Sequence, residues 1–149
     1  MEASQVQTFK SSDFHEFAKL ISNGEIENIQ ISKGDFNGVL QVVMTPNLIV
    51  SMFSQNRAIF QKGHSASGYF SFLIWDPSAS FNWRNVQLKR GMMPVLLGIE
   101  HVALIGEDFI GYPISIREEF FVEYCKARGF GHLPKLFMVI WPSLEKHKT

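Results

Sequence analysis

The segment Gln30–Met44, "QISKGDFNGVLQVVM", decides the expected fold. Residues at every second position of its second half would share one side of an extended chain. They are Phe36, Gly38, Leu40, Val42 and Met44. Lys33-Gly34-Asp35 precedes them and suits a turn. The pattern predicts a strand that is entered through a turn, and Gly38 inside it predicts a bend.

The same pattern continues along most of the chain, where short apolar runs are divided by turn residues such as Pro46 and Pro77. We expect strands at 26–32, 36–45, 47–54, 57–61, 68–75, 81–88, 93–99, 102–106 and 112–114. Many short strands at this spacing are typical of an antiparallel sandwich or barrel. The expected fold is therefore mostly β, with a jelly roll over 26–114.

A short helix is expected before the strands. Asp13 followed by Glu16 has the spacing of a capping box, and Phe14, Phe17 and Ile21 would share one face of a helix over 12–22.

Helical periodicity returns after the strands. Ser115 and Glu118 have capping-box spacing and Gly129 suits the end of a helix, so we expect a helix at 116–128. The apolar segment 135–141, "KLFMVIW", is predicted as a helix or a strand, because a short apolar run has no decisive period. It extends the expected helical region to 116–147.

Composition limits the classes of function. The 149 residues suit one domain over 1–149, and a formal net charge of +0 lacks the basic excess of a self-sufficient nucleic-acid binder. The single Cys125 fits a reducing compartment, and the start of the chain lacks a signal-peptide pattern. The longest apolar stretches fall short of a membrane span. We expect a cytoplasmic protein with no membrane contact.

The sequence offers little chemistry for catalysis. The five histidines stand at 15, 64, 101, 132 and 147 without a His-x-His pair, so we expect no metal site. Cys125 on a helix suits a small buried side chain, and no nucleophile elbow or phosphate-binding loop occurs. We expect no catalytic residues, no cofactor and no enzyme activity.

A binding site has more support. The strand 68–75, "GYFSFLIW", is apolar on both faces, so its second face needs either a covering helix or a ligand cavity. Arg57 has the forked donors that suit an anionic or hydroxylated ligand, although an exposed turn arginine also fits. His64 is expected in a loop at a pocket mouth or in a solvated turn. The candidate ligand-binding residues are Arg57, His64, Phe70, Phe72, Trp75 and His101.

Four segments in order resemble one protein family: "DFHEFAKLI", "QISKGDFNGVL", "GYFSFLI" and "SIREEFFVEYCKARG". Over Asp13 to Gly129 the chain resembles the N-terminal effector-binding and dimerisation domain of AraC-family transcriptional regulators. The resemblance implies a cupin-like jelly roll that binds a small effector, followed by helices that pair two protomers. In that family DNA is bound by a separate C-terminal helix-turn-helix domain, for which this chain has no room after Thr149.

The expected function is therefore a ligand-sensing and dimerisation domain of a transcription regulator. The abundance of Phe favours a small apolar effector over a sugar. A homodimer would form through Phe120, Phe121, Tyr124, Leu136, Phe137 and Ile140, and the hydrophilic "EKHKT" would begin a linker. Two alternatives stay open: a metal-dependent cupin enzyme, and a structural dimerisation module without a ligand.

Overall fold

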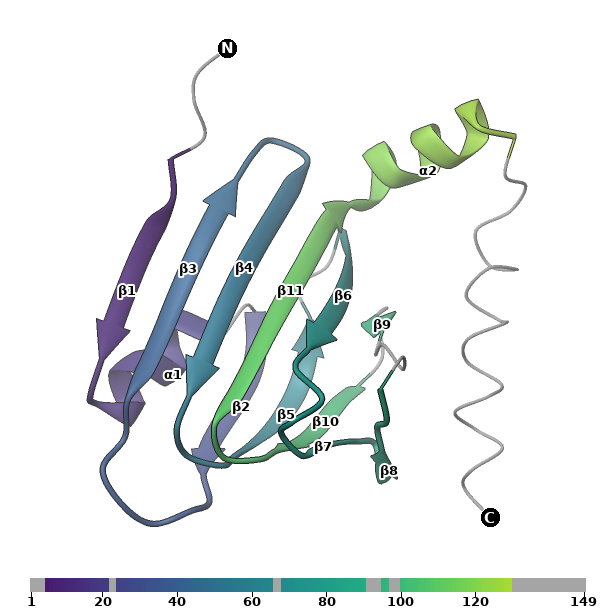
Figure 1. Ribbon diagram of the computed structural model, residues 1–149. Helices are drawn as coiled ribbons and strands as arrows, with labels where there is room; N and C mark the ends of the chain where they lie inside the picture. Colours follow the sequence, from purple (N-terminus) through teal and green to yellow (C-terminus); the bar gives the residue numbers. More distant parts are fainter. Residues whose placement is uncertain (1–4, 22–23, 66–67, 91–94, 97–99, 130–149) are drawn as a thin grey trace.

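The computed structural model describes residues 5–21, 24–65, 68–90, 95–96 and 100–129 (Figure 1). The helices are α1 (Phe14–Ile21) and α2 (Glu118–Ala127). The strands are β1 (Gln7–Ser11), β2 (Gly24–Gln30), β3 (Gly38–Met44), β4 (Leu48–Gln55), β5 (Ile59–Ser65), β6 (Tyr69–Trp75), β7 (Phe81–Trp83), β8 (Val86–Gln87), β9 (Val95–Leu96), β10 (Glu100–Ile105) and β11 (Phe109–Arg117). The predicted segment 135–141 lies outside the described residues.

The strands form two antiparallel sheets that face each other (Figure 1). Sheet A has the order β1-β3-β4-β11-β6-β9, and sheet B has the order β2-β5-β10-β7-β8. Strands β4 to β11 divide into two groups of four, 4-11-6-9 and 5-10-7-8, and this division is that of a jelly roll. The predicted mostly-β jelly-roll sandwich is confirmed, and β1, β2 and β3 extend its sheets.

Strand alternation decides which side chains enter the interior. In β3 the predicted inner residues Leu40, Val42 and Met44 pair with Phe53, Ser51 and Ile49 of β4, which also face inward. The segment that decided the expected fold is therefore an inner wall of the sandwich.

Gly38 has a different role from the predicted bend. It lies at the start of β3, and a Cβ atom there would come within 2.6 Å of the Phe17 ring. Phe17 of α1 is fully buried at this point. The glycine is needed because a helix side chain approaches the sheet backbone closely.

The first turn of α1 is capped as its sequence predicts. The Asp13 carboxylate accepts hydrogen bonds from the backbone N–H groups of His15 (2.8 Å) and Glu16 (3.2 Å). Glu16 completes the cap through Ser11 of β1, whose hydroxyl donates to the Glu16 carboxylate and accepts from the Asp13 N–H.

The second predicted capping box is wrong. Ser115 belongs to β11, which runs to Arg117, because this strand pairs with β4 on one side and β6 on the other. Residue Arg117 precedes α2 and makes no side-chain capping bond. The predicted strand 112–114 was too short for the same reason.

Other strands also differ from the predicted ones. Strand β1 was not expected, since "QTFKS" has no apolar alternation, yet it pairs with β3 at the edge of sheet A. The predicted strand 81–88 is a hairpin, in which Arg84 and Asn85 have positive φ angles of 49° and 64°. Of the predicted strand 93–99, the described part is Val95–Leu96.

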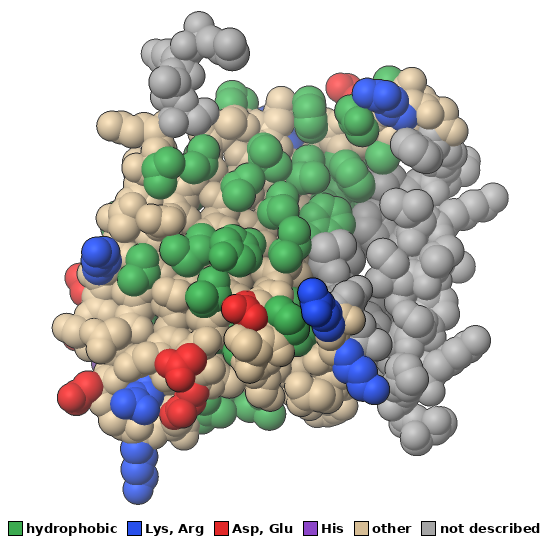
Figure 2. Space-filling view, viewed as in Figure 1, with side chains coloured by type: hydrophobic (Ala, Val, Ile, Leu, Met, Phe, Trp, Pro, Cys, Tyr) green, Lys and Arg blue, Asp and Glu red, His purple; other side chains and the backbone are tan. Residues whose placement is uncertain are grey.

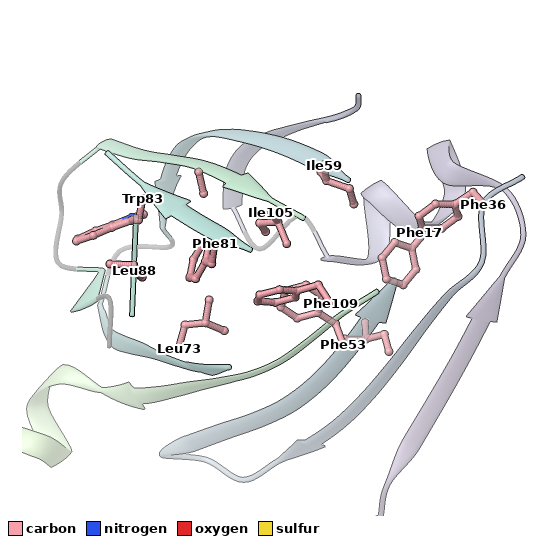
Figure 3. Packing of buried hydrophobic residues seen from close by; sticks show 12 residues of the cluster. Phe17, Phe36, Phe53, Ile59, Leu73, Phe81, Trp83, Leu88, Ile105 and Phe109 are labelled. Atoms are coloured by element: carbon pink, nitrogen blue, oxygen red, sulfur yellow. The ribbon is translucent and has the colours of Figure 1, made fainter. Parts of the chain in front are cut away.

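Buried apolar side chains form one cluster between the sheets (Figure 3), and we call the end of the sandwich near the turn from β10 to β11 the filled end. Ile59, Phe81, Ile105 and Phe109 are fully buried there, close to the turn that joins β10 to β11. The Phe109 ring lies 5.4 Å from that of Phe53 and 5.5 Å from that of Phe81. These edge and tilted contacts are favourable aromatic geometries.

The outer face of sheet A is also apolar, as Figure 2 shows over β3, β4, β11 and β6. Its exposed members include Val50, Ile74 and Tyr112. The outward-facing residues of these four strands carry no charge. Within the described ranges, neither helix is long and apolar enough to cross a membrane.

Candidate functional site

The end of the sandwich opposite the filled end is hollow. A cavity of about 310 Å³ lies between the sheets there, near the turn from β3 to β4. Residues of sheet A, sheet B and α1 line it: Leu20, Ile21, Ile26, Leu40, Val42, Met44, Ile49, Ser51, Phe53, Gln61, Ser71, Phe72, Leu73, His101, Pro113 and Ser115. Met44 is 61% exposed, so the cavity reaches the surface beside it. We call this region the open end.

A chain of hydrogen bonds runs along the sheet B wall of the cavity. The Trp83 indole N–H donates to Nδ1 of His101 (3.1 Å), and Nε2 of His101 lies 3.0 Å from Oε1 of Gln61. Nε2 of Gln61 then donates to Oδ1 of Asn28 (2.7 Å), whose amide lies 3.4 Å from the Ile26 carbonyl. Every member of this chain therefore has a defined donor direction.

The Trp83 contact fixes the protonation of His101. Because Nδ1 accepts a hydrogen bond, the proton of the neutral ring must sit on Nε2, where it is donated to Gln61. The ring is only 3% exposed, and this burial lowers the pKa of His101 to about 4. His101 is therefore neutral at pH 7 and serves the network as a rigid connector.

Two serine hydroxyls stand on the sheet A wall. Ser71 of β6 and Ser115 of β11 are paired across the strands, and their Oγ atoms are 2.8 Å apart. Both are buried, and both line the cavity. Ser51 of β4 adds a third hydroxyl. Each sheet therefore contributes a few polar groups to an otherwise apolar cavity.

The six predicted ligand-binding residues do not form one site. His101 points into the cavity. Phe72 is also among the lining residues, but it pairs with the outward-facing Ile114 and its ring lies 6.2 Å from that of Phe121, so its side chain belongs to the outer face of sheet A. Phe70 points to the outer face of sheet A and contacts Phe121 at 5.0 Å, so α2 covers it. Trp75 belongs to the filled end, stacked on Phe109 at 6.5 Å.

Arg57 and His64 lie away from the cavity lining. Arg57 donates to the Asp35 carbonyl (3.0 Å) and lies 3.5 Å from Glu107, so it joins loops near the filled end. His64 was predicted in a loop, but β5 continues through it because β5 pairs with both β2 and β10. Its side chain is exposed on the outer face of sheet B.

The predicted dimerisation residues fall into two groups. Phe120 and Tyr124 are 45% and 49% exposed on α2, whereas Phe121 packs against sheet A in the same protomer. Leu136, Phe137 and Ile140 lie outside the described residues. Within the described ranges, no three His, Cys, Asp or Glu side chains are grouped closely enough to hold a metal ion.

Sequence reasoning missed Gln61, Ser71, Ser115 and Trp83. Ser71 did have a visible signal, since it is the single polar residue inside the run "YFSFLIW". A polar side chain in a doubly buried strand needs a partner, and its partner is on another strand. Gln61 could be found only by knowing that it faces the same side of sheet B as His101. That depends on how β5 and β10 are aligned, which the sequence does not reveal.

No protein-family model matches the chain, and no curated protein sequence matches it significantly. Among solved structures, KdgF from Halomonas sp. is similar with a TM-score of 0.41 and 12% identity, over 56% of this chain and 83% of that one. The plu4264 protein from Photorhabdus luminescens has a TM-score of 0.40 and 13% identity, over 68% and 91%. A predicted oxalate decarboxylase from Thermotoga maritima has a TM-score of 0.41 and 13% identity, over 64% and 96%.

Proposed function

We propose that this chain is a ligand-sensing and dimerisation domain of a transcription regulator of the AraC type, and that it binds a small, largely apolar effector at the open end. The main observation that supports this proposal is the cavity of about 310 Å³ between the sheets. Ligand sites are typically concave and mostly apolar, with a few convergent polar groups, and this cavity has that composition.

The size of the cavity supports a small effector. A dry cavity of about 150 Å³ accommodates benzene, so about twice that volume suits a molecule of about twelve non-hydrogen atoms. The apolar lining residues, such as Val42, Ile49 and Leu73, supply most of the contact surface. The regulator assignment itself rests on the resemblance in sequence.

The proposed homodimer has support on the surface. Phe120 and Tyr124 on α2 expose large apolar side chains beside the uncharged outer face of sheet A. Soluble monomers rarely expose a contiguous apolar patch of this kind. A two-fold interface brings a surface against itself, and an uncharged patch avoids like-charge contacts across the axis.

Native mass spectrometry tests both parts of the proposal. The purified protein should be a dimer, and it should retain a small organic molecule or take one up. The variant Val42→Phe fills the cavity from β3 and should lose the adduct, whereas Val102→Phe on the outer face of sheet B should keep it. Equal binding by both variants would contradict the site.

The dimer has its own test. Phe120→Glu with Tyr124→Glu places charges on the exposed side of α2, and light scattering should then report a monomer that still binds the ligand. A monomeric unsubstituted protein at micromolar concentration would refute the dimer. For the regulator assignment, the chain fused to a DNA-binding domain that requires dimerisation should bind its operator, and the double variant should not.

A further inference from the structure

We propose that the open end selects an uncharged molecule with an apolar body and one hydrogen-bond acceptor oxygen, such as a ketone, an ester or a lactone. This inference rests on the proposed function, since it specifies the ligand of the same cavity. It follows from the charges and the unused hydrogen-bond donors of the lining residues.

The lining excludes an ionised ligand. None of the sixteen described residues that line the cavity is Lys, Arg, Asp or Glu. His101 also supplies no charge, because its Nδ1 accepts from the Trp83 indole and an added proton there would face that N–H donor. A carboxylate buried without a counter-charge is strongly disfavoured, so fatty acids and aromatic acids do not fit.

The sheet B wall keeps one donor unused. His101 is saturated, since one ring nitrogen accepts from Trp83 and the other donates to Gln61. The Gln61 amide oxygen accepts that bond, and one N–H of its amide nitrogen donates to Asn28. An amide nitrogen carries two hydrogens. The second N–H of Gln61 has no acceptor among the described residues and remains for a ligand.

The sheet A wall also has donors in excess. The Ser71 and Ser115 hydroxyls carry two hydrogens, and their mutual hydrogen bond uses only one of them. Ser51 lines the same cavity and makes no side-chain hydrogen bond among the described residues. A ligand with an acceptor oxygen can accept a hydrogen bond from one of these groups, whereas a hydrocarbon offers an acceptor to none of them.

Three probes of similar size separate the possibilities: valerophenone, an uncharged ketone; pentylbenzene, its hydrocarbon counterpart; and phenylpentanoate, a carboxylate. Dissociation constants are measured by calorimetry on the full chain at pH 7. We expect valerophenone to bind about fivefold to tenfold more tightly than pentylbenzene, although pentylbenzene is the more apolar. Phenylpentanoate should bind most weakly.

Variants then identify the donors. The double change Ser71→Ala with Ser115→Ala removes a hydrogen-bonded pair together, so neither hydroxyl is left unpaired. Gln61→Met removes the amide N–H. At least one of these variants should lose the preference for the ketone while its affinity for pentylbenzene stays within twofold. Ser54→Ala, on the outer face of β4, is the matched control and should keep the preference.

The outcomes distinguish the two proposals. Tighter binding of the hydrocarbon or the carboxylate by the unsubstituted protein would overturn this inference and leave the proposed ligand site standing. A ketone preference that survives in a variant with Ser51, Ser71, Ser115 and Gln61 all replaced would also overturn it. If none of the three probes binds, although a cooperative thermal unfolding transition shows that the protein is folded, the proposed function is overturned as well.

Discussion

The two ends of the sandwich are built from the same strands and differ in what they enclose. At the filled end, Phe81, Ile105 and Phe109 are fully buried between the sheets, and their rings and side chains belong to one apolar cluster. At the open end, mostly apolar side chains, three serines and a neutral histidine surround about 310 Å³ of free space. Close packing stabilises the filled end, whereas the free space at the open end costs stability and is where the proposed ligand would bind.

Two glutamines show the same contrast. Gln55 on β4, at the filled end, is 3% exposed, and neither of its side-chain polar atoms has a hydrogen-bond partner among the described residues. Gln61 at the open end belongs to a directed chain with His101 and Asn28. A buried amide without a partner lowers stability, whereas an amide in a network with one spare donor can recognise a ligand.

The largest expected effect concerns the packing of the filled end. Phe109→Ala removes a fully buried ring in contact with Phe53 and Phe81, and it should lower the free energy of unfolding by about 3–5 kcal/mol. Ile49→Ala at the open end borders existing free space and should cost only about 1 kcal/mol. Urea denaturation measures both values, and equal losses would contradict the division into two ends.

Low pH should decrease the free energy of unfolding through His101 at the open end. The unfolded chain protonates His101 near its ordinary pKa of 6.5, but burial lowers the pKa in the folded chain to about 4. The unfolded state therefore binds more protons between these values, and the free energy of unfolding falls as pH decreases from 6.5 to 4. This one group should account for roughly 3 kcal/mol.

A comparison of variants isolates that contribution. His101→Gln keeps an acceptor for Trp83 and a donor for Gln61 without a titrating ring, so its stability should depend less on pH in this window. His64→Gln, on the outer face of sheet B, should behave like the unsubstituted protein. Parallel pH profiles for all three proteins would refute the role of His101.

A smaller loss is expected at the contact between α1 and β3. Gly38→Ala places a methyl group 2.6 Å from the Phe17 ring, and the resulting shift should cost about 1–3 kcal/mol in urea denaturation. Phe17→Leu should recover part of this loss in the Gly38→Ala background although it is destabilising alone. If the losses of the two single variants simply add in the double variant, contact with the Phe17 ring is not the reason for a glycine at position 38.

The smallest effect has the opposite sign. Gln55→Met replaces the unpaired buried amide by an apolar chain of similar size, and it should raise the free energy of unfolding by about 1 kcal/mol. Gln41→Met on the exposed side of β3 should change stability little. A destabilised Gln55→Met variant would indicate that the amide has a partner, such as a buried water.

The sequence predicted the fold well because the strands of a sandwich alternate visibly. Leu40, Val42 and Met44 face inward as the opening segment indicated. The errors lie where a neighbouring strand decides the structure. Ser115 has helix-capping spacing, but pairing on both sides keeps it in β11, and β1 becomes a strand only because β3 offers it an edge.

The site was less predictable for a related reason. His101 was selected from its sequence, but its partners Gln61 and Trp83 stand on other strands, and only the register brings them together. Arg57 had suitable chemistry but lies near the filled end, held by Asp35. Strand patterns indicate which residues face inward, and they carry no information on which end of the sandwich remains unfilled.

The most direct test of the central claim is a methyl chemical-shift titration with valerophenone by NMR. The account predicts saturable shifts for Ile26, Val42, Ile49 and Leu73, which line the cavity, and unchanged positions for Ile59 and Ile105 at the filled end. Shifts confined to Val50, Ile74 and the outer face of sheet A, or no saturable shifts at the open end, would contradict it.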